Sequence, residues 1–278
     1  MSETPRTPGN ADAPAAADAP PGIDTRVPHS ARIWNYWLGG KDNYPVDREA
    51  GEAFRALYPE IVEIARYSRV FLGRAMRYLV EDAGIRQFLD IGTGLPAVET
   101  THQLAQRLAP ETRVVYVDND PLVLAHARAL LVGTPEGATD YVDADLRDPD
   151  RILKAAAGTL DLSRPVGVML MGVMGHVPDD DEALAIVRHL MAALPSGSHL
   201  TLYDGTDVGE AAHAAQDDYN EGGAVPYILR SRERLARFFD GLELVEPGLV
   251  SLPRWRPEIA EPEERGEMNA AGAVARKP

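Results

Sequence analysis

From Ile85 onward the chain alternates short apolar extended runs with helix-sized connections. This pattern is typical of a parallel sheet that helices cover on both faces. The five predicted strands are Arg86–Ile91, Arg113–Val117, Thr139–Asp143, Val166–Val173 and His199–Tyr203. We therefore expect an α/β fold that begins with five parallel strands.

Two further extended runs, Leu242–Val250 and Asn269–Arg276, follow without an obvious helix between them. Strands joined without a crossover helix pair antiparallel, so these two should form an antiparallel pair at the sheet edge. The prediction for residues 85–278 is a seven-stranded sheet, mostly parallel, with the last strand antiparallel.

The segment 23–84 is predicted to be helical. Ser30 is the expected N-cap of a first helix that Gly39-Gly40 stops, and Asp47 is the expected N-cap of a second, short helix. A longer amphipathic helix should run from Glu60 to Asp82. The segment is too short for an independent domain, so we expect it to pack across one end of the sheet as a lid.

Composition limits the function. The chain has 43 acidic and 28 basic residues and a net charge of −15, which repels phosphate backbones and favours a small-molecule substrate over nucleic acid. Cysteine is absent and the seven histidines form no ligand-spaced cluster, so we expect no metal site. The Pro- and Ala-rich stretch 1–22 is predicted to be a disordered tail rather than a signal peptide, and no window approaches a membrane helix. The expected location is the cytoplasm.

The first predicted strand ends in a glycine loop, Asp90-Ile91-Gly92-Thr93-Gly94. Glycines at the carboxyl end of a parallel strand let the backbone approach a bound cofactor. Gly92, Gly94 and Ala97 also fit the dinucleotide pattern G-x-G-x-x-G/A, and a turn that only joins strand to helix would explain them too.

Asp90 and Pro96 favour S-adenosylmethionine (SAM) over NAD or a flavin. A carboxylate suits the ammonium of the methionine part of SAM and is unfavourable beside a pyrophosphate. Pro96, expected at the start of the next helix, removes an amide donor that a phosphate site would use.

Asp118 ends the second predicted strand and is the expected partner of the cofactor's ribose hydroxyls. This assignment fits SAM and NAD equally. Asn119 is a candidate contact to adenine, whereas Asp120, followed by proline, is the expected N-cap of a helix.

Acidic residues also follow the third predicted strand. Asp145 is the candidate acceptor for the adenine amino group, with Leu146 against the ring face. Asp143 at the strand end is an alternative, and Asp148 is interpreted as another N-cap.

The fourth predicted strand leads to a candidate catalytic residue, His176. A neutral imidazole could deprotonate a hydroxyl or amine acceptor, although a bond to a loop carbonyl explains this histidine equally well. Substrate contacts are expected from Met174, from Tyr203 and Asp204 after the fifth strand, and from the segment Tyr219–Tyr227, which alternatively forms a homodimer contact.

At this point the sequence resembles the class I SAM-dependent methyltransferases, and within them a bacterial S-adenosyl methyltransferase family formerly classed as a domain of unknown function. The resemblance covers nearly everything after the tail. It is carried by Pro28, Ala31-Arg32, Leu38 to Asn43, Asp47-Arg48, Arg69 with Phe71-Leu72, Phe88 to Pro96, Val114 to Ala129, Met171-Gly172-Val173, Phe239-Asp240-Gly241, Trp255-Arg256-Pro257 and Arg276-Lys277-Pro278. It implies a Rossmann-like methyltransferase sheet and SAM as cofactor, but no established acceptor. The cofactor contacts that it implies are Asp90, Gly92, Gly94 and Asp118, and we add Thr93 and Met171.

The polar block from Leu38 to Asn43 follows a helix stop and is hard to explain by packing. We hypothesise that it closes over the cofactor. The residues expected to help are Tyr36, Lys41, Asp42 and Asn43, with Tyr44 toward the acceptor.

Three functions remain open from the sequence. The first is a SAM-dependent methyltransferase with an unidentified small-molecule acceptor. The others are a SAM-binding regulator without turnover and an NAD(P)-dependent oxidoreductase.

Overall fold

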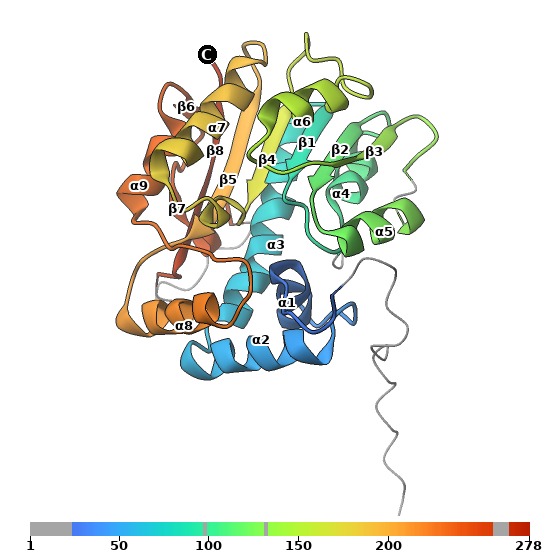
Figure 1. Ribbon diagram of the computed structural model, residues 1–278. Coiled ribbons are helices and arrows are strands. Elements are labelled where there is room, and N and C mark those ends of the chain that lie inside the picture. The colour runs from blue at the N-terminus through green and yellow to red at the C-terminus, as the bar shows by residue number, and fades with distance from the viewer. Residues whose placement is uncertain (1–23, 97–98, 131–132, 258–266) are drawn as a thin grey trace, which may run out of the picture.

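A computed structural model of the chain describes residues 24–96, 99–130, 133–257 and 267–278 (Figure 1). The predicted tail 1–22 and Ala97 lie outside these ranges. Five parallel strands form the body of the sheet in the order β3-β2-β1-β4-β5, which confirms the predicted α/β fold. Their bounds are β1 Gln87–Ile91, β2 Arg113–Asp118, β3 Ala138–Asp143, β4 Gly167–Met171 and β5 His199–Gly205.

The sheet ends in antiparallel strands, but it has eight strands and not seven. β8 (Ala270–Arg276) pairs antiparallel with β5 on one side and with both β6 (Glu243–Leu244) and β7 (Val250–Ser251) on the other. The predicted single strand 242–250 is split because a turn interrupts it, where Gly248, at φ +84°, donates its N–H to the carbonyl of Val245. The last strand therefore lies inside the sheet and not at its edge.

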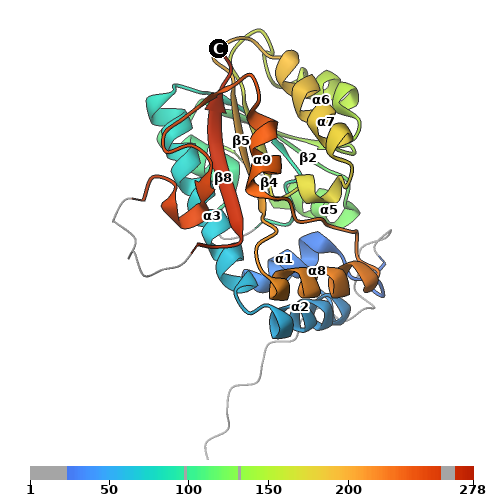
Figure 2. The same cartoon turned by 90° about the vertical axis from the view of Figure 1, so that its left-hand side faces the viewer.

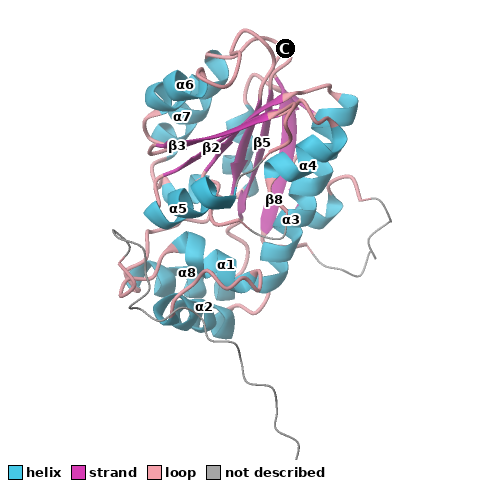
Figure 3. Ribbon diagram, turned by 90° about the vertical axis from the view of Figure 1, so that its right-hand side faces the viewer, coloured by secondary structure: helices cyan, strands magenta, loops and turns pink. Residues whose placement is uncertain are grey.

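Side chains alternate along the strands and build two apolar layers. Leu89 and Val115 face one side, and Phe88 and Tyr116 face the other. Figures 2 and 3 show the sheet between α6 and α7 on one face and α3 on the other. The helices of these layers are α3 Ile61–Arg77, α4 Thr101–Leu108, α6 Pro149–Ala156, α7 Asp180–Ala192 and α9 Arg232–Ala236. A π-helix, η2 (Tyr78–Asp82), follows α3, and three short 3-10 helices are η3 Met174–His176, η4 Arg237–Phe239 and η5 Leu252–Arg254.

The helix after β1 begins later than predicted. Thr100 and Gln103 form a capping box at the start of α4, so Pro96 lies in the loop. The argument that Pro96 removes a donor from a helix N-terminus is therefore wrong, because no helix starts there.

Three helices form what we call the cap, which lies below the carboxyl ends of the strands in Figure 1: α1 (Ser30–Trp37), α2 (Pro45–Leu57) and α8 (Glu210–Glu221). α8 comes from the C-terminal half of the chain, whereas α3, inside the predicted lid segment, packs on the sheet. None of the helices in the described ranges is both long and apolar enough to cross a membrane.

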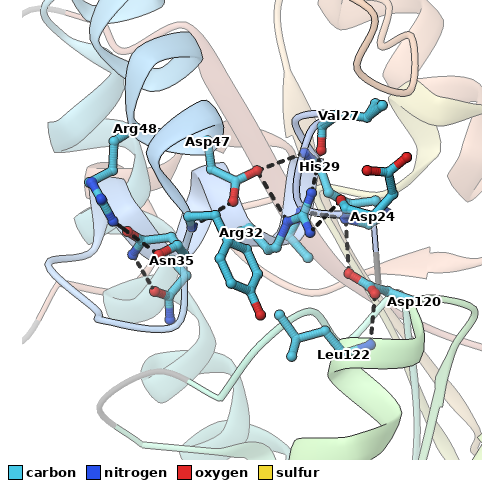
Figure 4. Close-up of polar contacts among 12 residues, drawn as sticks. Asp24, Val27, His29, Arg32, Asn35, Asp47, Arg48, Asp120 and Leu122 are labelled. Atoms are coloured by element: carbon cyan, nitrogen blue, oxygen red, sulfur yellow. Dashed lines mark hydrogen bonds and ion pairs between the residues drawn. The ribbon is translucent and has the colours of Figure 1, made fainter. Parts of the chain in front are cut away.

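The cap is organised around Asp47, which is fully buried (Figure 4). Its Oδ1 accepts hydrogen bonds from the backbone N–H of His29 at 3.0 Å and from Nε of Arg32 at 3.1 Å. Its Oδ2 accepts one from the N–H of Tyr44 at 2.8 Å. Asp47 is thus the third residue of α2 and not its N-cap, which is Tyr44; likewise His29, and not Ser30, is the N-cap of α1.

Candidate functional site

A cavity lies between the cap and the carboxyl ends of β1, β2, β4 and β5. Both ends of the chain contribute to it, since its lining runs from α1 to residues after α8. Eleven of the predicted site residues line it: Asp90, Gly92, Thr93, Gly94, Asp118, Asn119, Asp145, Leu146, Met171, His176 and Tyr203.

The glycine loop after β1 has two different glycines. Gly92 has φ +72°, and a Cβ there would lie 2.4 Å from Cγ2 of Val173, so a larger residue at this position would clash with Val173. Gly94 has φ +65°, but a Cβ there would meet no atom within 4 Å. Thr93 turns its hydroxyl back to the carbonyl of Asp90, at 3.1 Å. The open space of the loop is therefore at Gly94.

Asp90 is a buried carboxylate at the end of β1, with only 5% of its surface exposed. Its Oδ2 accepts a 2.5 Å hydrogen bond from Oγ1 of Thr101, at the start of α4. Burial raises the pKa of Asp90 to about 6, although the Thr101 hydrogen bond and the charge of Arg69 lower it. A cation that reached Asp90 through the cavity would stabilise the ionised form and lower this pKa.

Asp118 connects the loops that follow β1 and β2. Its Oδ2 accepts from the N–H of Gly94 at 2.8 Å, and its Oδ1 accepts from the N–H groups of Asn119 and Asp120 at 2.8 and 3.0 Å. Burial raises the pKa of Asp118. A carboxylate oxygen has two lone-pair sites, so Oδ1 is fully used while Oδ2 can accept a further bond from the cavity.

The loop after β3 places a polar and an apolar residue at the cavity. Asp145 is exposed, and its Oδ1 accepts from the N–H of Arg147 at 2.8 Å, whereas Leu146 is buried in the core. Asp143, the alternative to Asp145, does not line the cavity. The predicted N-cap roles are confirmed, because Asp148 accepts from the N–H of Arg151 and Asp120 from that of Leu122.

His176 lies in η3 after β4, with its ring edge against Tyr227. Its Nδ1 is 2.9 Å from the carbonyl oxygen of Pro226. A carbonyl only accepts, so Nδ1 has the proton and Nε2 is left as an acceptor. Burial lowers the pKa of His176, which favours the neutral form.

The four residues that we expected to help close the polar block over the cofactor do not line the cavity. The hydroxyl of Tyr36 donates to Glu52, Lys41 is exposed, and Asp42 faces Nε2 of His126 at 3.1 Å. The side-chain nitrogen of Asn43 donates to Asn35 at 2.9 Å. Asp42 and Asn43 thus contact other protein groups, and within the block only Leu38 lines the cavity.

Three predicted acceptor contacts also lie away from the cavity lining. Tyr44 packs with Leu122 in a small cluster beside α5 (Pro121–Leu130), and Met174 is fully buried in the core. Asp204 is buried, which raises its pKa to about 7, and it accepts a hydrogen bond from the hydroxyl of Tyr227. Asp204 itself does not line the cavity, but its hydrogen-bond partner Tyr227 does.

The cavity contains residues to which the sequence reasoning gave no role in the site. Arg69 of α3 lines it close to Asp90, and Trp34, Trp37 and Phe54 line its cap side. No local pattern marks such residues, because they meet only when α1 and α2 pack below the strand ends and α3 packs on the sheet.

Comparison with known proteins identifies the architecture. The chain from residue 16 to 278 matches the model of a family described as S-adenosyl methyltransferase. A crystal structure of a DUF574 family protein from Streptomyces avermitilis is 46% identical over 92% of this chain and 99% of that one, with a TM-score of 0.88. A proposed methyltransferase from Thermobifida fusca is 37% identical over 94% of this chain and 99% of that one, with a TM-score of 0.87.

More distant structures share the fold alone. The mitomycin 7-O-methyltransferase MmcR is 15% identical over 89% of this chain and 68% of that one, with a TM-score of 0.50. Comparison with curated protein sequences gave no significant match. The family match covers nearly all of the chain and decides against the dinucleotide alternative: this chain belongs to the S-adenosyl methyltransferase family, and it is a SAM-dependent methyltransferase.

Proposed function

We propose that SAM binds in this cavity along the carboxyl ends of β1, β2 and β3, and that a small-molecule acceptor binds between SAM and the cap. The observation that carries the proposal is Gly94, whose open side faces a cavity that Asp90 and Asp118 also line. A backbone turn with free space between two carboxylates fits a cofactor that presents an ammonium and two ribose hydroxyls.

Each proposed contact has its own chemistry. Asp90 would receive the ammonium of the methionine part, and Asp118 the ribose hydroxyls. Asp145 would accept from the adenine amino group, with Leu146 against the ring. Bound SAM supplies the methyl group from its sulfonium. The task of the chain is then to align the acceptor and to exclude water. The cap favours the exclusion of water because it covers the cavity.

His176 is the proposed general base. Its Nε2 is available as an acceptor, and burial lowers its pKa, so it is neutral and able to take a proton at neutral pH. The acceptor atom is then a hydroxyl oxygen or an amine nitrogen, which loses its proton as it gains the methyl group.

The acceptor is proposed to be a small molecule and not a nucleic acid. The net charge of −15 opposes a polyphosphate backbone, and the cap restricts access to the strand ends.

Calorimetry tests the cofactor site. We expect SAM and S-adenosylhomocysteine to bind, and NAD and NADP not to bind. Asp90→Ala and Asp118→Ala should each weaken SAM binding at least about tenfold, since each removes a charge-assisted contact. Asp143→Ala, at a strand end outside the cavity, is the matched control and should bind SAM normally. Unchanged SAM affinity in Asp90→Ala would contradict the proposal.

Transfer of labelled methyl from SAM into a metabolite extract tests the base. His176→Gln should keep SAM affinity but lose about a hundredfold in transfer rate, together with the low-pH limb of the rate profile. His189→Gln, at an exposed histidine of α7, is the control. If His176→Gln keeps the rate and its pH profile, His176 only anchors the loop at Pro226. Label in the nucleic acid fraction would contradict a small-molecule acceptor.

A further inference from the structure

The cap side of the cavity is walled by a continuous cluster of aromatic rings. Trp34 and Trp37 of α1 have ring centroids 5.5 Å apart, and Trp37 lies 5.2 Å from Phe54 of α2. Phe54 in turn lies 6.5 Å from Tyr58 and 6.1 Å from Tyr219 of α8. All five side chains line the cavity, so α1, α2 with its C-cap Tyr58, and α8 contribute to one wall.

Two polar atoms of this wall have partners within the protein. Nε1 of Trp37 donates to the carbonyl of Gly51 at 3.1 Å, and the hydroxyl of Tyr58 donates to Glu60 at 2.8 Å. A ligand in the cavity therefore meets the ring carbons of Trp37 and Tyr58, because their polar atoms already have hydrogen-bond partners.

The cap contributes no charged side chain to the cavity lining, as far as the described residues extend. Two arginines line the cavity, but neither belongs to the cap. Arg69 of α3 lies close enough to Asp90 to lower the pKa of that carboxyl, and Arg147, in the loop after β3, pairs with Glu182 at 3.2 Å. His29, the N-cap of α1, also lines the cavity and accepts from the N–H of Ala31. A carboxylate or phosphate placed against the ring cluster would lose its water without gaining a counter-charge.

We infer that the methyl acceptor is an uncharged, flat aromatic molecule that packs against this ring cluster. The inference rests on the proposed function, because it takes the cavity to be the site of methyl transfer. Edge-to-face contacts with the rings orient a flat ligand, and each such contact adds about three- to tenfold to the affinity beyond what burial alone provides. The acceptor's nucleophilic atom is then the polar part of an otherwise apolar molecule.

Three probes of the same carbon skeleton test the class by calorimetry on the full chain, saturated with S-adenosylhomocysteine. The probes are 2-naphthol, its anionic analogue 2-naphthoate and the saturated alcohol decahydro-2-naphthol. We expect 2-naphthol to bind at least about tenfold more tightly than either of the others, because only it is both flat and uncharged.

Two variants locate the binding. Phe54→Leu removes the ring that touches three others and should weaken 2-naphthol binding about three- to tenfold. Phe238→Leu, in the core on the other face of the sheet, is the matched control and should leave the affinity unchanged. If Phe54→Leu fails to fold, Gln216→Lys on α8 replaces it as the test, since Gln216 lines the wall side of the cavity.

Gln216→Lys introduces a cation beside the rings. It should improve 2-naphthoate binding at least about tenfold, because the carboxylate then has a counter-charge. Equal binding of 2-naphthoate or of the saturated alcohol to the unmodified chain would overturn the inference, as would absence of 2-naphthol binding in a chain that binds SAM. A chain that does not bind SAM refutes the proposed function instead, and the preliminary SAM titration separates these two failures.

Discussion

Nδ1 of His29 lies 3.0 Å from Oδ2 of Asp120, and this contact joins the N-cap of α1 to the N-cap of α5 beside the cavity (Figure 4). A second pair, Nε2 of His126 and Oδ1 of Asp42, lies 3.1 Å apart and connects α5 to the loop after α1. The cap is therefore attached to the sheet domain at two points on the side of the cavity where β2 ends.

The first prediction concerns the N-cap of α1. His29→Ala should lower the free energy of unfolding by about 0.5–2 kcal/mol, because the N–H of Ala31 loses the Nδ1 acceptor that caps α1. Ser30→Ala is the control, since the structure gives the capping role to His29. Urea denaturation of both variants measures the difference. A larger loss in Ser30→Ala would show that the assigned N-cap is wrong.

The second prediction concerns the buried pair in the cap. Asp47→Ala leaves the guanidinium of Arg32, which is 3% exposed, without its carboxylate partner and with only the carbonyls of Asp24 and Val27, and should cost about 3–5 kcal/mol. Asp42→Ala removes the half-exposed pair with His126 and should cost about 1 kcal/mol or less. Thermal unfolding compares the two, and similar losses would contradict the central role of Asp47.

The third prediction concerns pH. A carboxyl with a raised pKa binds its proton more tightly in the folded chain, so its ionisation destabilises the fold. For Asp90 this cost begins above the unfolded value of 3.8 and is complete once the pH exceeds the folded value of about 6. Asp90→Asn should therefore stabilise the SAM-free protein by up to roughly 3 kcal/mol at high pH, and by little near pH 4.

The same variant separates stability from function. We expect Asp90→Asn to unfold at higher urea concentration than the unmodified chain at pH 8 while binding SAM at least about tenfold more weakly. Urea titrations at several pH values, with and without SAM, measure both effects. A stability gain that does not change with pH would show that burial of charge is not its cause.

The fourth prediction compares the two glycines of the loop. Gly92→Ala forces a Cβ to 2.4 Å from Val173 and should lower both stability and SAM affinity. Gly94→Ala has space for its methyl group and bears only the strain of φ +65°. Its stability should fall by about 1 kcal/mol while SAM affinity falls about tenfold or more. Normal SAM affinity in Gly94→Ala would contradict the position proposed for the cofactor.

Local patterns were sufficient for most of the sheet and for the side of the cavity that the strand ends form. Apolar runs of strand length, separated by helix-sized connections, require a parallel sheet, and parallel strands bring their carboxyl ends to one edge. Asp90, Gly94 and Asp118 lie at such ends, so their positions along the chain determined that they would meet. The antiparallel pairing could be predicted because no helix-sized connection separates the last two extended runs. The turn at Gly248 that splits one of these runs depends on packing around β8.

The cap side of the cavity was decided by tertiary structure alone. Phe54 and Tyr219 are far apart in sequence, and nothing near either residue indicates that α8 returns to pack beside α2. The partners of the polar block from Leu38 to Asn43, among them Asn35 and His126, likewise become visible only once the helices are placed. The pattern of apolar residues along the sequence indicates which groups lie at the strand ends, whereas contacts between distant helices depend on side-chain packing in three dimensions.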